Sequence, residues 1–362
     1  MNVAVAGTRG IPARYGGFET FAEEISTRLA ARGHEVTVYT RDRYYKGPEF
    51  NGVHIVKVTG AKSKYADTLS HMATTALRAR GHDIVLVCNA ANAAFCPLLK
   101  RHNAKVVLAV DGHERLRRKW NRAAKLWYVL NERLAGLVAD AVVADAGVIQ
   151  TYYRERLRTE TTMIPYGAPV DRLSHGNEWL SRFGLRPRGY FLYVSRLEPE
   201  NNADLVIEAY RSVKSEMPLV IVGDSPYATS FKEHVKQLAS LDPRVILTGG
   251  VYGEGYRELL ENAHAYIQAT EVGGTHPALI EAMGAGNLII FLDTPENVEV
   301  AGGCGIGFSD RAELASAMVN TLNTDYSELA HSAIDRVKTR YSWDIVTDAY
   351  EKLFYSLAGG RE

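Results

Sequence analysis

The fold of this chain is decided by the stretch Gly273-Gly274-Thr275-His276-Pro277-Ala278-Leu279-Ile280-Glu281-Ala282-Met283-Gly284-Ala285-Gly286, which follows the strand-like run 265–270. Its paired glycines allow the backbone to come close to a ligand. Pro277 suits the first position of a helix, and the amides and dipole of such a helix start form an anion site. Glu281 lies about one turn further along and leans back toward this start. The stretch therefore predicts a site for a diphosphate joined to a ribose.

Strand-like and helix-like segments alternate along the whole chain, which indicates parallel sheets. The predicted strands of the first half are 2–6, 35–40, 53–58, 84–88, 106–110 and 141–144. Those of the second half are 190–194, 219–222, 245–248, 265–268 and 288–291. A helix is predicted over 20–32, and the turn-rich segment 164–169 separates the two series. We therefore predict an α/β protein of two doubly wound, Rossmann-like domains that face a central cleft.

Length and composition exclude several classes of protein. The chain has 362 residues, enough for two domains, and is 46% hydrophobic and 23% charged. No apolar run approaches the ~20 residues that span a bilayer, and the N-terminus runs directly into a strand, which argues against a signal peptide. The three cysteines, Cys88, Cys96 and Cys304, show neither zinc spacing nor a disulfide framework. We expect a cytoplasmic protein without a bound metal.

The two halves of the chain carry opposite charge. Residues 1–170 hold 25 Lys and Arg against 15 Asp and Glu, a net charge of +10. The remaining basic and acidic residues of the chain, in 171–362, give a net charge of −10. Such a basic half is suited to an anionic partner, although two halves of opposite sign also attract one another across a cleft. No nucleic-acid-binding motif accompanies the charge, so nucleic acid is not expected as a partner.

Three motifs, in this order along the chain, resemble a known family. The run 273–283 is similar to the donor-binding signature of retaining glycosyltransferases of family 4, which adopt the GT-B fold, and Val194-Ser195-Arg196-Leu197-Glu198-Pro199-Glu200 resembles their second signature. The opening motifs, 7–12 and 15–20, resemble the subgroup that contains bacterial rhamnosyltransferases. The resemblance covers nearly the whole chain.

The resemblance implies an activity and a domain plan. The enzyme would be a retaining glycosyltransferase that moves a sugar, with rhamnose as the leading candidate, from a nucleoside-diphosphate sugar to a glycan or lipid-linked acceptor in cell-surface polysaccharide synthesis. Residues 1–168 would bind the acceptor and residues 169–340 the nucleotide sugar. Residues 341–362 would form a helix that crosses back to the first domain. Proteins of this fold do not usually need a metal, so no cofactor is expected.

Cations or oriented amides are needed where the diphosphate departs. Arg196 follows a strand, where ligands bind in open α/β sheets, and we predict that it stabilises the diphosphate, although a loop arginine is also a common surface residue. Asn201 stands where the family usually has a lysine, and we retain it as a donor-binding candidate. Arg9, in the first loop, is our candidate for the missing second charge.

The donor sugar and ribose would be held by the stretch that opens this section. The family pattern has two glutamates; Glu281 is the second and Gly273 occupies the position of the first. Glu271 lies two residues earlier and is an alternative. Backbone amides remain as donor contacts, and the residues expected to provide them are Gly274, Thr275 and His276. The His276 side chain would face the sugar or serve only as a polar helix cap.

Two further sites are predicted for the nucleotide. Gly16 and Gly17 precede a helix and suit the close approach of a phosphate, or form a plain turn. Tyr252, in the loop after the strand 245–248, would stack on the base or pack against a neighbour.

The acceptor side of the reaction is predicted after the strand 105–110. By resemblance, His113 occupies the region where the family places a histidine near the transferred sugar, although a lone loop histidine is often structural. Asp111 and Glu114 are rival candidates for acceptor binding, and Asp111 is equally suited to cap the following helix.

The segment 115–133 combines basic residues with aromatic ones. Its members are Arg115, Arg117, Arg118, Lys119, Arg122, Lys125 and Arg133, with Trp120, Trp127 and Tyr128. This pattern predicts peripheral contact with a membrane surface or a polyanionic acceptor, or else a helix that is aromatic on its packed face and basic on its solvated one.

Two other functions fit the same residues. Asn201 and Gly273 stand where charge is expected, which is also compatible with a degenerate subunit that only binds nucleotide sugars. A nucleotide-sugar 2-epimerase would need a carboxylate poised to abstract a proton, and Asp111 and Glu114 are the only candidates.

Overall fold

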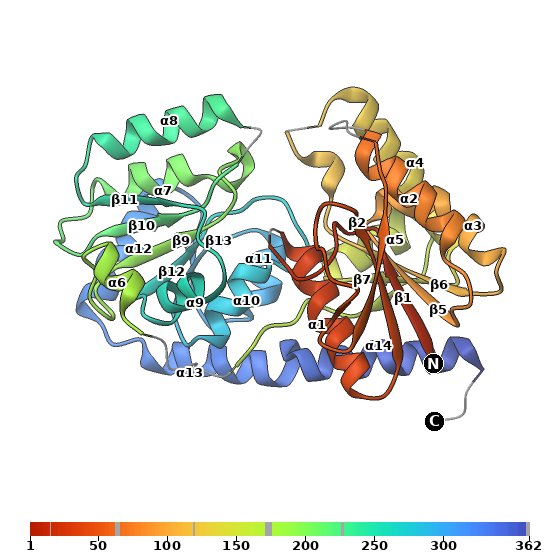
Figure 1. Ribbon diagram of the computed structural model, residues 1–362. Coiled ribbons are helices and arrows are strands. Elements are labelled where there is room, and N and C mark those ends of the chain that lie inside the picture. The colour runs from red at the N-terminus through yellow and green to blue at the C-terminus, as the bar shows by residue number, and fades with distance from the viewer. Residues whose placement is uncertain (15, 62–65, 119, 171–175, 226–227, 360–362) are drawn as a thin grey trace. The chain divides into compact units, whose positions relative to one another are not determined.

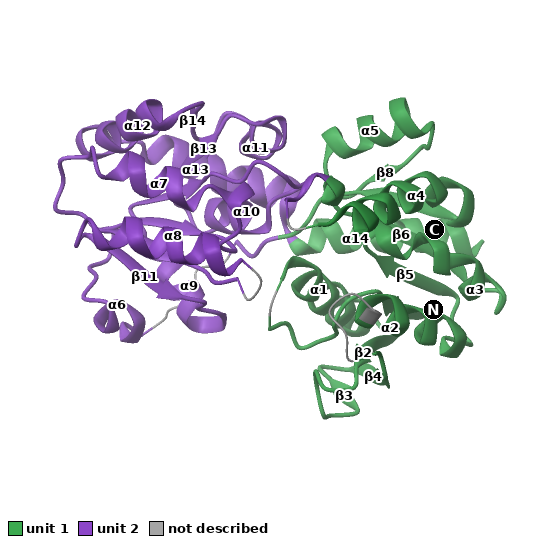
Figure 2. Cartoon of the chain, turned by 90° about the horizontal axis from the view of Figure 1, so that it is seen from above, with its two compact units in different colours: residues 1–115, 120–167, 343–362 green, residues 116–119, 168–342 purple. Residues whose placement is uncertain are grey.

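The computed structural model describes residues 1–14, 16–61, 66–118, 120–170, 176–225 and 228–359, so Tyr15 of the opening motif and Lys119 of the basic segment lie outside the described residues. The chain forms two compact units (Figures 1 and 2). Unit 1 comprises residues 1–115, 120–167 and 343–362, and unit 2 comprises residues 116–119 and 168–342. The segment 116–119 groups with unit 2 although the chain on both sides of it belongs to unit 1.

Unit 1 is built on an eight-stranded sheet with the strand order β3-β4-β2-β1-β5-β6-β7-β8. All neighbouring pairs are parallel except β3 with β4. The strands are β1 (Asn2–Ala6), β2 (Glu35–Arg41), β3 (Glu49–Phe50), β4 (Val53–Val58), β5 (Ile84–Cys88), β6 (Lys105–Val110), β7 (Ala141–Ala144) and β8 (Thr162–Met163). The central strands are buried on both faces and therefore read as continuous apolar runs.

Helices cover both faces of this sheet. They are α1 (Gly17–Ala31), α2 (Ala66–Arg78), α3 (Cys96–Lys100), α4 (Arg122–Val138), α5 (Gly147–Leu157) and α14 (Trp343–Ala358), with the 3-10 turns η1 (Ala90–Phe95) and η2 (Glu114–Leu116). One core lies between the sheet and the helices α2, α4 and α5, where Met72, Ala135 and Tyr153 are buried.

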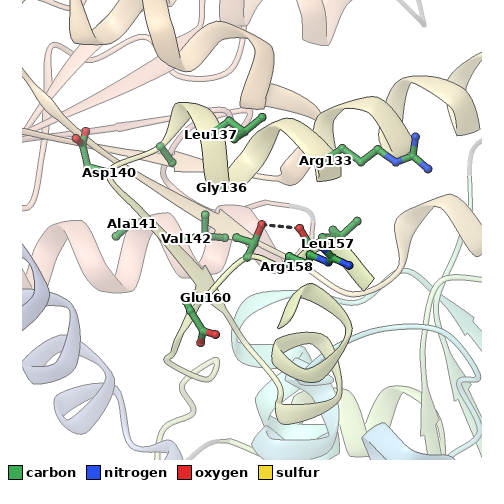
Figure 3. A pocket seen from close by; sticks show the side chains of 11 residues that line it. Arg133, Gly136, Leu137, Asp140, Ala141, Val142, Leu157, Arg158 and Glu160 are labelled. Atoms are coloured by element: carbon green, nitrogen blue, oxygen red, sulfur yellow. Dashed lines mark hydrogen bonds between the residues drawn. The ribbon is translucent and has the colours of Figure 1, made fainter. Parts of the chain in front are cut away.

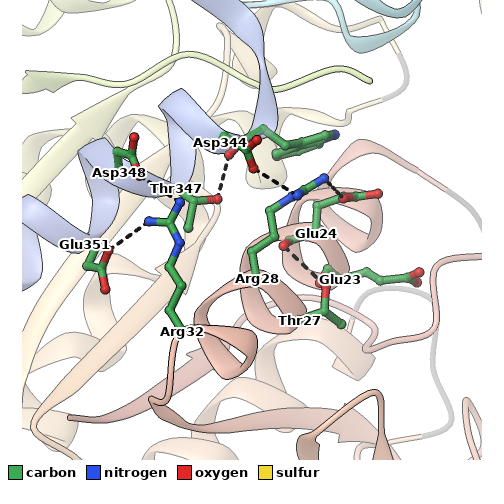
Figure 4. Close-up of polar contacts among 10 residues, drawn as sticks. Glu23, Glu24, Thr27, Arg28, Arg32, Asp344, Thr347, Asp348 and Glu351 are labelled. Carbon is green, nitrogen blue, oxygen red and sulfur yellow. Dashed lines mark hydrogen bonds and ion pairs between the residues drawn. The ribbon is translucent and has the colours of Figure 1, made fainter. Parts of the chain in front are cut away.

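Helix α14, the last in the chain, packs on α1 within unit 1. Tyr350 of α14 contacts Phe21 of α1, with their ring centroids 5.4 Å apart. Three basic side chains of unit 1 also pair with acidic residues of α14, and Figure 4 shows two of them, Arg28 and Arg32. The pairs are Arg28 with Asp344 at 3.1 Å, Arg32 with Asp348 at 2.7 Å and with Glu351 at 2.8 Å, and His34 with Glu351 at 2.6 Å.

Unit 2 is built on a six-stranded, fully parallel sheet with the order β11-β10-β9-β12-β13-β14. Its strands are β9 (Phe191–Val194), β10 (Leu219–Val222), β11 (Val245–Gly249), β12 (Ala265–Gln268), β13 (Leu288–Leu292) and β14 (Ile306–Phe308). Its helices are α6 (Glu178–Arg182), α7 (Ala203–Tyr210), α8 (Thr229–Ser240), α9 (Gly253–Glu261), α10 (Pro277–Gly284), α11 (Pro295–Ala301), α12 (Arg311–Asn323) and α13 (Ser327–Arg336), with the 3-10 turn η3 (Pro199–Asn201) and the π-turn η4 (Val337–Tyr341). One core lies between the sheet and the helices α7, α8 and α12.

The predicted α/β class with parallel sheets is confirmed, and every predicted strand is present with bounds that differ by at most one residue. The short strands β3, β8 and β14 are additional. Each is two or three residues long, too short for an alternating or apolar run to be recognised in the sequence. Among the described residues, no helix is long and apolar enough to cross a membrane.

Candidate active site

The two donor motifs meet at one edge of the unit 2 sheet. Strand β9 is the parallel neighbour of β12, so the loops that follow both strands leave the sheet at the same edge. The Glu271 amide in the second loop donates a hydrogen bond of 3.0 Å to the Glu200 carbonyl in the first. Segments about seventy residues apart in the sequence are thereby joined in one site.

The loop after β9 is braced from within by Asn201. The Asn201 side-chain amide donates to the Arg196 carbonyl at 2.6 Å, and the Tyr193 hydroxyl donates to the Asn201 carbonyl at 2.5 Å. Asn201 is only 3% exposed, whereas the Arg196 side chain is 34% exposed. Asn201 therefore fixes the loop, and Arg196 is the member of the pair that is open to a ligand.

Glu281 lies in α10 and binds a tyrosine that the sequence motifs do not reveal. The Tyr256 hydroxyl, from α9, donates to Glu281 Oε2 at 2.6 Å. A phenol on one carboxylate oxygen orients the side chain. Tyr256 belongs to a helix that follows a different strand, so only the folded structure brings it to Glu281.

Gly273, Gly274, Thr275 and His276 form the buried turn that leads into α10. His276 is the N-cap residue of that helix, although its side chain makes no capping hydrogen bond. A Cβ atom at residue 273 would lie 2.4 Å from His276 Cε1. The imidazole therefore occupies the space that the expected glutamate would need.

A buried charged cluster lies beside this turn. Arg117 Nη1 is 4.0 Å from Glu198 Oε2 and 4.0 Å from Glu200 Oε1, and Arg196 Nη2 is 3.7 Å from the same Glu198 oxygen. Burial, together with the charge of Arg117, lowers the pKa of His276 to about 3, so the imidazole is neutral. Arg117 appears in the sequence only as one basic residue among many, which is why motif reasoning does not select it.

Tyr252 is placed at the N-cap of α9 and is 53% exposed. Its ring lies close to Gly250, where a Cβ atom would come within 3.0 Å of the hydroxyl. The ring is exposed, and its stacking on a base stays a prediction.

In unit 1, the first loop is organised by a buried glutamate. The Arg9 amide donates to Glu19 Oε1 at 3.0 Å, and the Arg9 carbonyl accepts hydrogen bonds from residues 40 and 41 of β2. Burial raises the pKa of Glu19. The hydrogen bond from the Arg9 amide and the charge of Arg9 act in the opposite direction but do not cancel this effect. Gly16 has a positive φ of 99°, and Gly17 begins α1. The loop conformation therefore depends on Gly16 and on Glu19.

The predicted acceptor residues lie after β6 in unit 1. The His113 ring packs edge-on against Tyr152 with the centroids 4.5 Å apart, and burial and the charge of Arg115 lower its pKa to about 4. Asp111 Oδ1 accepts from the Gly112 amide at 2.7 Å, and Glu114 Oε2 accepts from Trp120 Nε1 at 3.2 Å. Asp111 thus holds its own turn, and His113 is a neutral imidazole.

A pocket of about 370 Å³ lies elsewhere in unit 1, at the amino end of β7 (Figure 3). Its lining comes from the ends of α4 and α5 and the start of β7, and it contains none of the residues predicted for the donor or acceptor site. Because ligands of such sheets bind at the carboxyl ends of the strands, we do not assign the donor to it. In the described part of the chain, no three His, Cys, Asp or Glu side chains are grouped to hold a metal ion.

Comparisons with known proteins agree with this architecture. Residues 188–324 match the family described as glycosyl transferases group 1, and residues 1–169 match a domain of unknown function, DUF1972. Over 271 residues the chain is 26% identical to the GDP-mannose-dependent alpha-(1-6)-phosphatidylinositol monomannoside mannosyltransferase of Mycolicibacterium smegmatis, covering 68% of this chain and 67% of that protein.

Two solved structures are similar over almost their whole length. Sucrose-phosphate synthase from Thermosynechococcus elongatus has a TM-score of 0.82 at 16% identity, covering 99% of each chain. The Anabaena protein HepE in complex with UDP-glucose has a TM-score of 0.77 at 16% identity, covering 97% of this chain and 98% of that one. These likenesses establish the GT-B fold. The domain match in unit 2 and the mannosyltransferase relative support a glycosyltransferase that acts on a nucleotide sugar.

Proposed function

We propose that this chain is a retaining glycosyltransferase of family 4, which transfers a sugar from a nucleoside-diphosphate sugar to a glycan or lipid-linked acceptor in cell-surface polysaccharide synthesis. Rhamnose is the proposed sugar because of the opening motifs. The observation that carries the proposal is the convergence of Arg196, Glu281 and the start of α10 on one edge of the unit 2 sheet. A partly exposed cation, an oriented carboxylate and a helix start suit a diphosphate and a ribose.

The proposed reaction breaks the bond between sugar C1 and the β-phosphate oxygen and forms a bond from C1 to the acceptor oxygen. The proton of the acceptor hydroxyl passes to the departing phosphate on the same face of the sugar. Arg196 stabilises the charge that develops on the diphosphate, and Glu281 accepts hydrogen bonds from the ribose. This scheme needs no protein nucleophile, and we propose that it needs no metal.

We propose that unit 1 contributes the acceptor site and further donor contacts. Asp111, His113 and Glu114 are the acceptor candidates; of these, the neutral His113 can accept or donate a hydrogen bond to a sugar hydroxyl. Gly16 and Gly17 suit the approach of a phosphate, and Arg9 provides a charge in the same loop. An Arg9→Ala variant that keeps wild-type turnover would remove Arg9 from the scheme.

A thermal-shift panel of UDP, dTDP, GDP and ADP, each alone and with its common sugars, tests the donor proposal. A ligand at 100 times its dissociation constant should add ~2.7 kcal/mol to the free energy of unfolding. We expect one nucleotide to raise the melting temperature clearly, and we expect Arg196→Ala and Glu281→Ala to abolish that rise. Absence of any shift would contradict the proposed site.

The stereochemistry requires a separate experiment. The product made from the donor identified in the thermal-shift panel should show the donor's anomeric configuration by proton NMR. Activity should also persist in EDTA. An inverted product would exclude the retaining mechanism. Donor binding without hydrolysis or transfer to any acceptor would favour the alternative of a binding subunit, for which the packing of Gly273 against His276 and the structural role of Asn201 are the supporting observations. An epimerised donor formed without acceptor would favour the epimerase.

We further propose that unit 1 contacts an anionic membrane surface through α4. Three leucines of α4 are exposed: Leu126 by 59%, Leu130 by 46% and Leu137 by 80%. Their spacing places them on one helix face, and the exposed Arg122 and Arg133 lie along its edge. A leucine face bordered by cations fits the boundary between lipid headgroups and acyl chains.

The tryptophans of this region have a different role from the exposed leucines. Trp127 Nε1 donates to the Ala91 carbonyl at 3.0 Å, and Trp120 Nε1 donates to Glu114. The opposite face of α4 buries Tyr128, Glu132 and Ala135. The aromatic residues thus anchor the helix to its own unit, which leaves the leucines as the proposed membrane contacts.

A further inference from the structure

The segment 116–119 inserts one buried arginine into unit 2. Arg117 is 8% exposed, and its neighbours along the chain, Leu116 and Arg118, are exposed. The chain enters this segment from unit 1 and returns to unit 1 after it. The segment therefore places the Arg117 guanidinium at the loop that follows β9, while its exposed neighbour Arg118 lies 3.8 Å from Glu271 in the loop that follows β12.

Three observations locate this guanidinium in the donor region. It lies 4.0 Å from Glu198 and 4.0 Å from Glu200 in the loop after β9. It also acts electrostatically on His276, the N-cap residue of α10. Because Arg196 lies 3.7 Å from the same Glu198 oxygen, the two guanidinium groups share one carboxylate.

The Glu200 carboxylate is loosely held in this cluster. A separation of 4.0 Å is too long for a hydrogen bond, and the Glu200 carboxylate, in a residue only 1% exposed, has no hydrogen-bond partner for either oxygen among the described residues. Buried charges without close hydrogen bonds are costly to a fold. Such a cost is expected where charged groups are held ready for a ligand rather than for packing.

We propose that Arg117 is the second cation of the diphosphate site, in the role for which the family pattern has a lysine at the position of Asn201. The inference rests on the proposed function. In the protein without donor, Glu198 and Glu200 hold the guanidinium beside Arg196. When the donor binds, Arg117 and Arg196 together bind its diphosphate, and Arg117 binds the β-phosphate, on which negative charge develops as the sugar leaves.

The test compares nucleotides that differ by one phosphate. The probes are whichever of UDP, dTDP, GDP and ADP binds the wild-type chain best, and the matching monophosphate. Calorimetry would measure both affinities for Arg117→Gln, for Arg117→Lys, and for the double variant Arg117→Gln with Glu200→Gln. Arg311→Gln is the matched control, because Arg311 is an exposed cation of the same unit that pairs with Glu208 on α7.

We expect Arg117→Gln to weaken diphosphate binding by at least about tenfold and monophosphate binding by less, since a charged hydrogen bond to the β-phosphate is lost. Arg117→Lys should recover part of the loss. In Arg117→Gln the Glu200 charge loses its partner, and the double variant removes that charge so that the protein still folds. Its diphosphate affinity should remain as low as that of Arg117→Gln. Arg311→Gln should bind like the wild type.

Two results would overturn the inference about Arg117 alone. Wild-type diphosphate affinity in the double variant would mean that Arg117 only neutralises Glu200, and an Arg117→Gln variant equal to Arg311→Gln would mean that it contributes nothing. A wild-type chain that binds none of the four nucleotides would overturn the proposed function, and this inference with it.

Discussion

Gly273 lies against the imidazole ring of His276, and this contact governs the shape of the turn before α10. A methyl group at residue 273 would approach His276 Cε1 to 2.4 Å and Nδ1 to 2.9 Å. Both residues are buried, so the ring has little room to move aside. A glutamate at residue 273 would displace His276 and, with it, the start of the helix that we assign to the diphosphate.

Gly273→Ala should therefore lower the free energy of unfolding by about 1–3 kcal/mol, the usual cost of overpacking. Gly176→Ala is the matched control, because a Cβ atom there would contact nothing within 4 Å, and it should change stability by less than about 0.5 kcal/mol. Chemical denaturation measures both. The double variant Gly273→Ala with His276→Ala should recover part of the loss; full additivity of the two changes would contradict the steric account.

The buried His276 makes stability depend on pH. Its pKa is lowered from 6.5 to about 3 in the folded chain, by burial first and by Arg117 second. Between these pH values the unfolded chain binds the proton and the folded chain does not, so the free energy of unfolding falls as the pH drops below about 6.5. His276→Asn should lose less stability than the wild type between pH 6.5 and pH 4.5. Parallel denaturation curves that fall equally with pH in the two proteins would argue against a neutral, buried His276.

At the scale of elements, α14 is tied to α1 by a network centred on Glu351. Burial opposes ionisation of this carboxyl group, but hydrogen bonds from His34 and Arg32 outweigh it and lower the pKa of Glu351 (Figure 4 shows Arg32 with Glu351). A carboxylate with a lowered pKa stabilises the fold above its unfolded pKa, near 4.5, and loses that contribution as the pH falls through the folded value.

Glu351→Gln should reduce the free energy of unfolding by about 1 kcal/mol at pH 7, because a partly buried network is worth more than an isolated surface pair. The difference from the wild type should shrink as the pH falls below 4. Asp335→Asn is the control, because Asp335 is 76% exposed and pairs with Lys338 at 3.9 Å. This substitution should change the free energy of unfolding by less than about 0.5 kcal/mol. Thermal melts across pH 3–8 measure both variants. Equal changes in stability for Glu351→Gln and Asp335→Asn would contradict a stabilising role for the network.

The exposed leucines of α4 lead to a testable prediction about membrane binding. Leu126→Gln with Leu130→Gln should strongly reduce co-sedimentation with liposomes that contain anionic lipid, at low salt. Binding of the wild type should weaken as salt screens its basic residues. Leu241→Gln, which changes a leucine that is 61% exposed in unit 2, should bind like the wild type. Wild-type protein that stays in the supernatant at low salt would rule out this surface.

The longer, buried strands of both sheets are predictable because each is an apolar run bounded by turn residues, as in 2–6 and 288–291, whereas the short strands β3, β8 and β14 are not. The positions of Arg196 after a strand and of Glu281 in the first turns of a helix are predictable, because each stands in its own motif; their roles stay predictions. Arg117 and Tyr256 are not predictable in this way. Arg117 reaches the site only because the segment 116–119 joins unit 2, and Tyr256 only because α9 packs near α10; both depend on tertiary contacts that no local pattern encodes.

At the scale of the whole molecule, unit 1 is built from both ends of the chain. Trp343 of α14 packs against Tyr166 with ring centroids 5.0 Å apart, and a Cβ atom at Gly167 would lie 2.4 Å from the Trp343 ring. Tyr350 and Phe354 are 2% and 0% exposed. The fold of unit 1 therefore needs residues that the chain reaches only after completing unit 2.

Deletion of residues 343–362 should consequently unfold unit 1 and spare unit 2. Losing even one buried aromatic residue costs about 3–5 kcal/mol, so losing Trp343, Tyr350 and Phe354 together removes about as much as a whole domain's usual stability of 5–15 kcal/mol. Limited proteolysis with mass spectrometry should leave a resistant fragment within 168–342 while residues 1–167 are degraded. In the full chain, Phe354→Ala should sensitise residues 1–167 to protease and its exposed neighbour Tyr355→Ala should not. If residues 1–167 stayed protected after the deletion, unit 1 would fold without α14, and the packing of α1 on that helix would be dispensable.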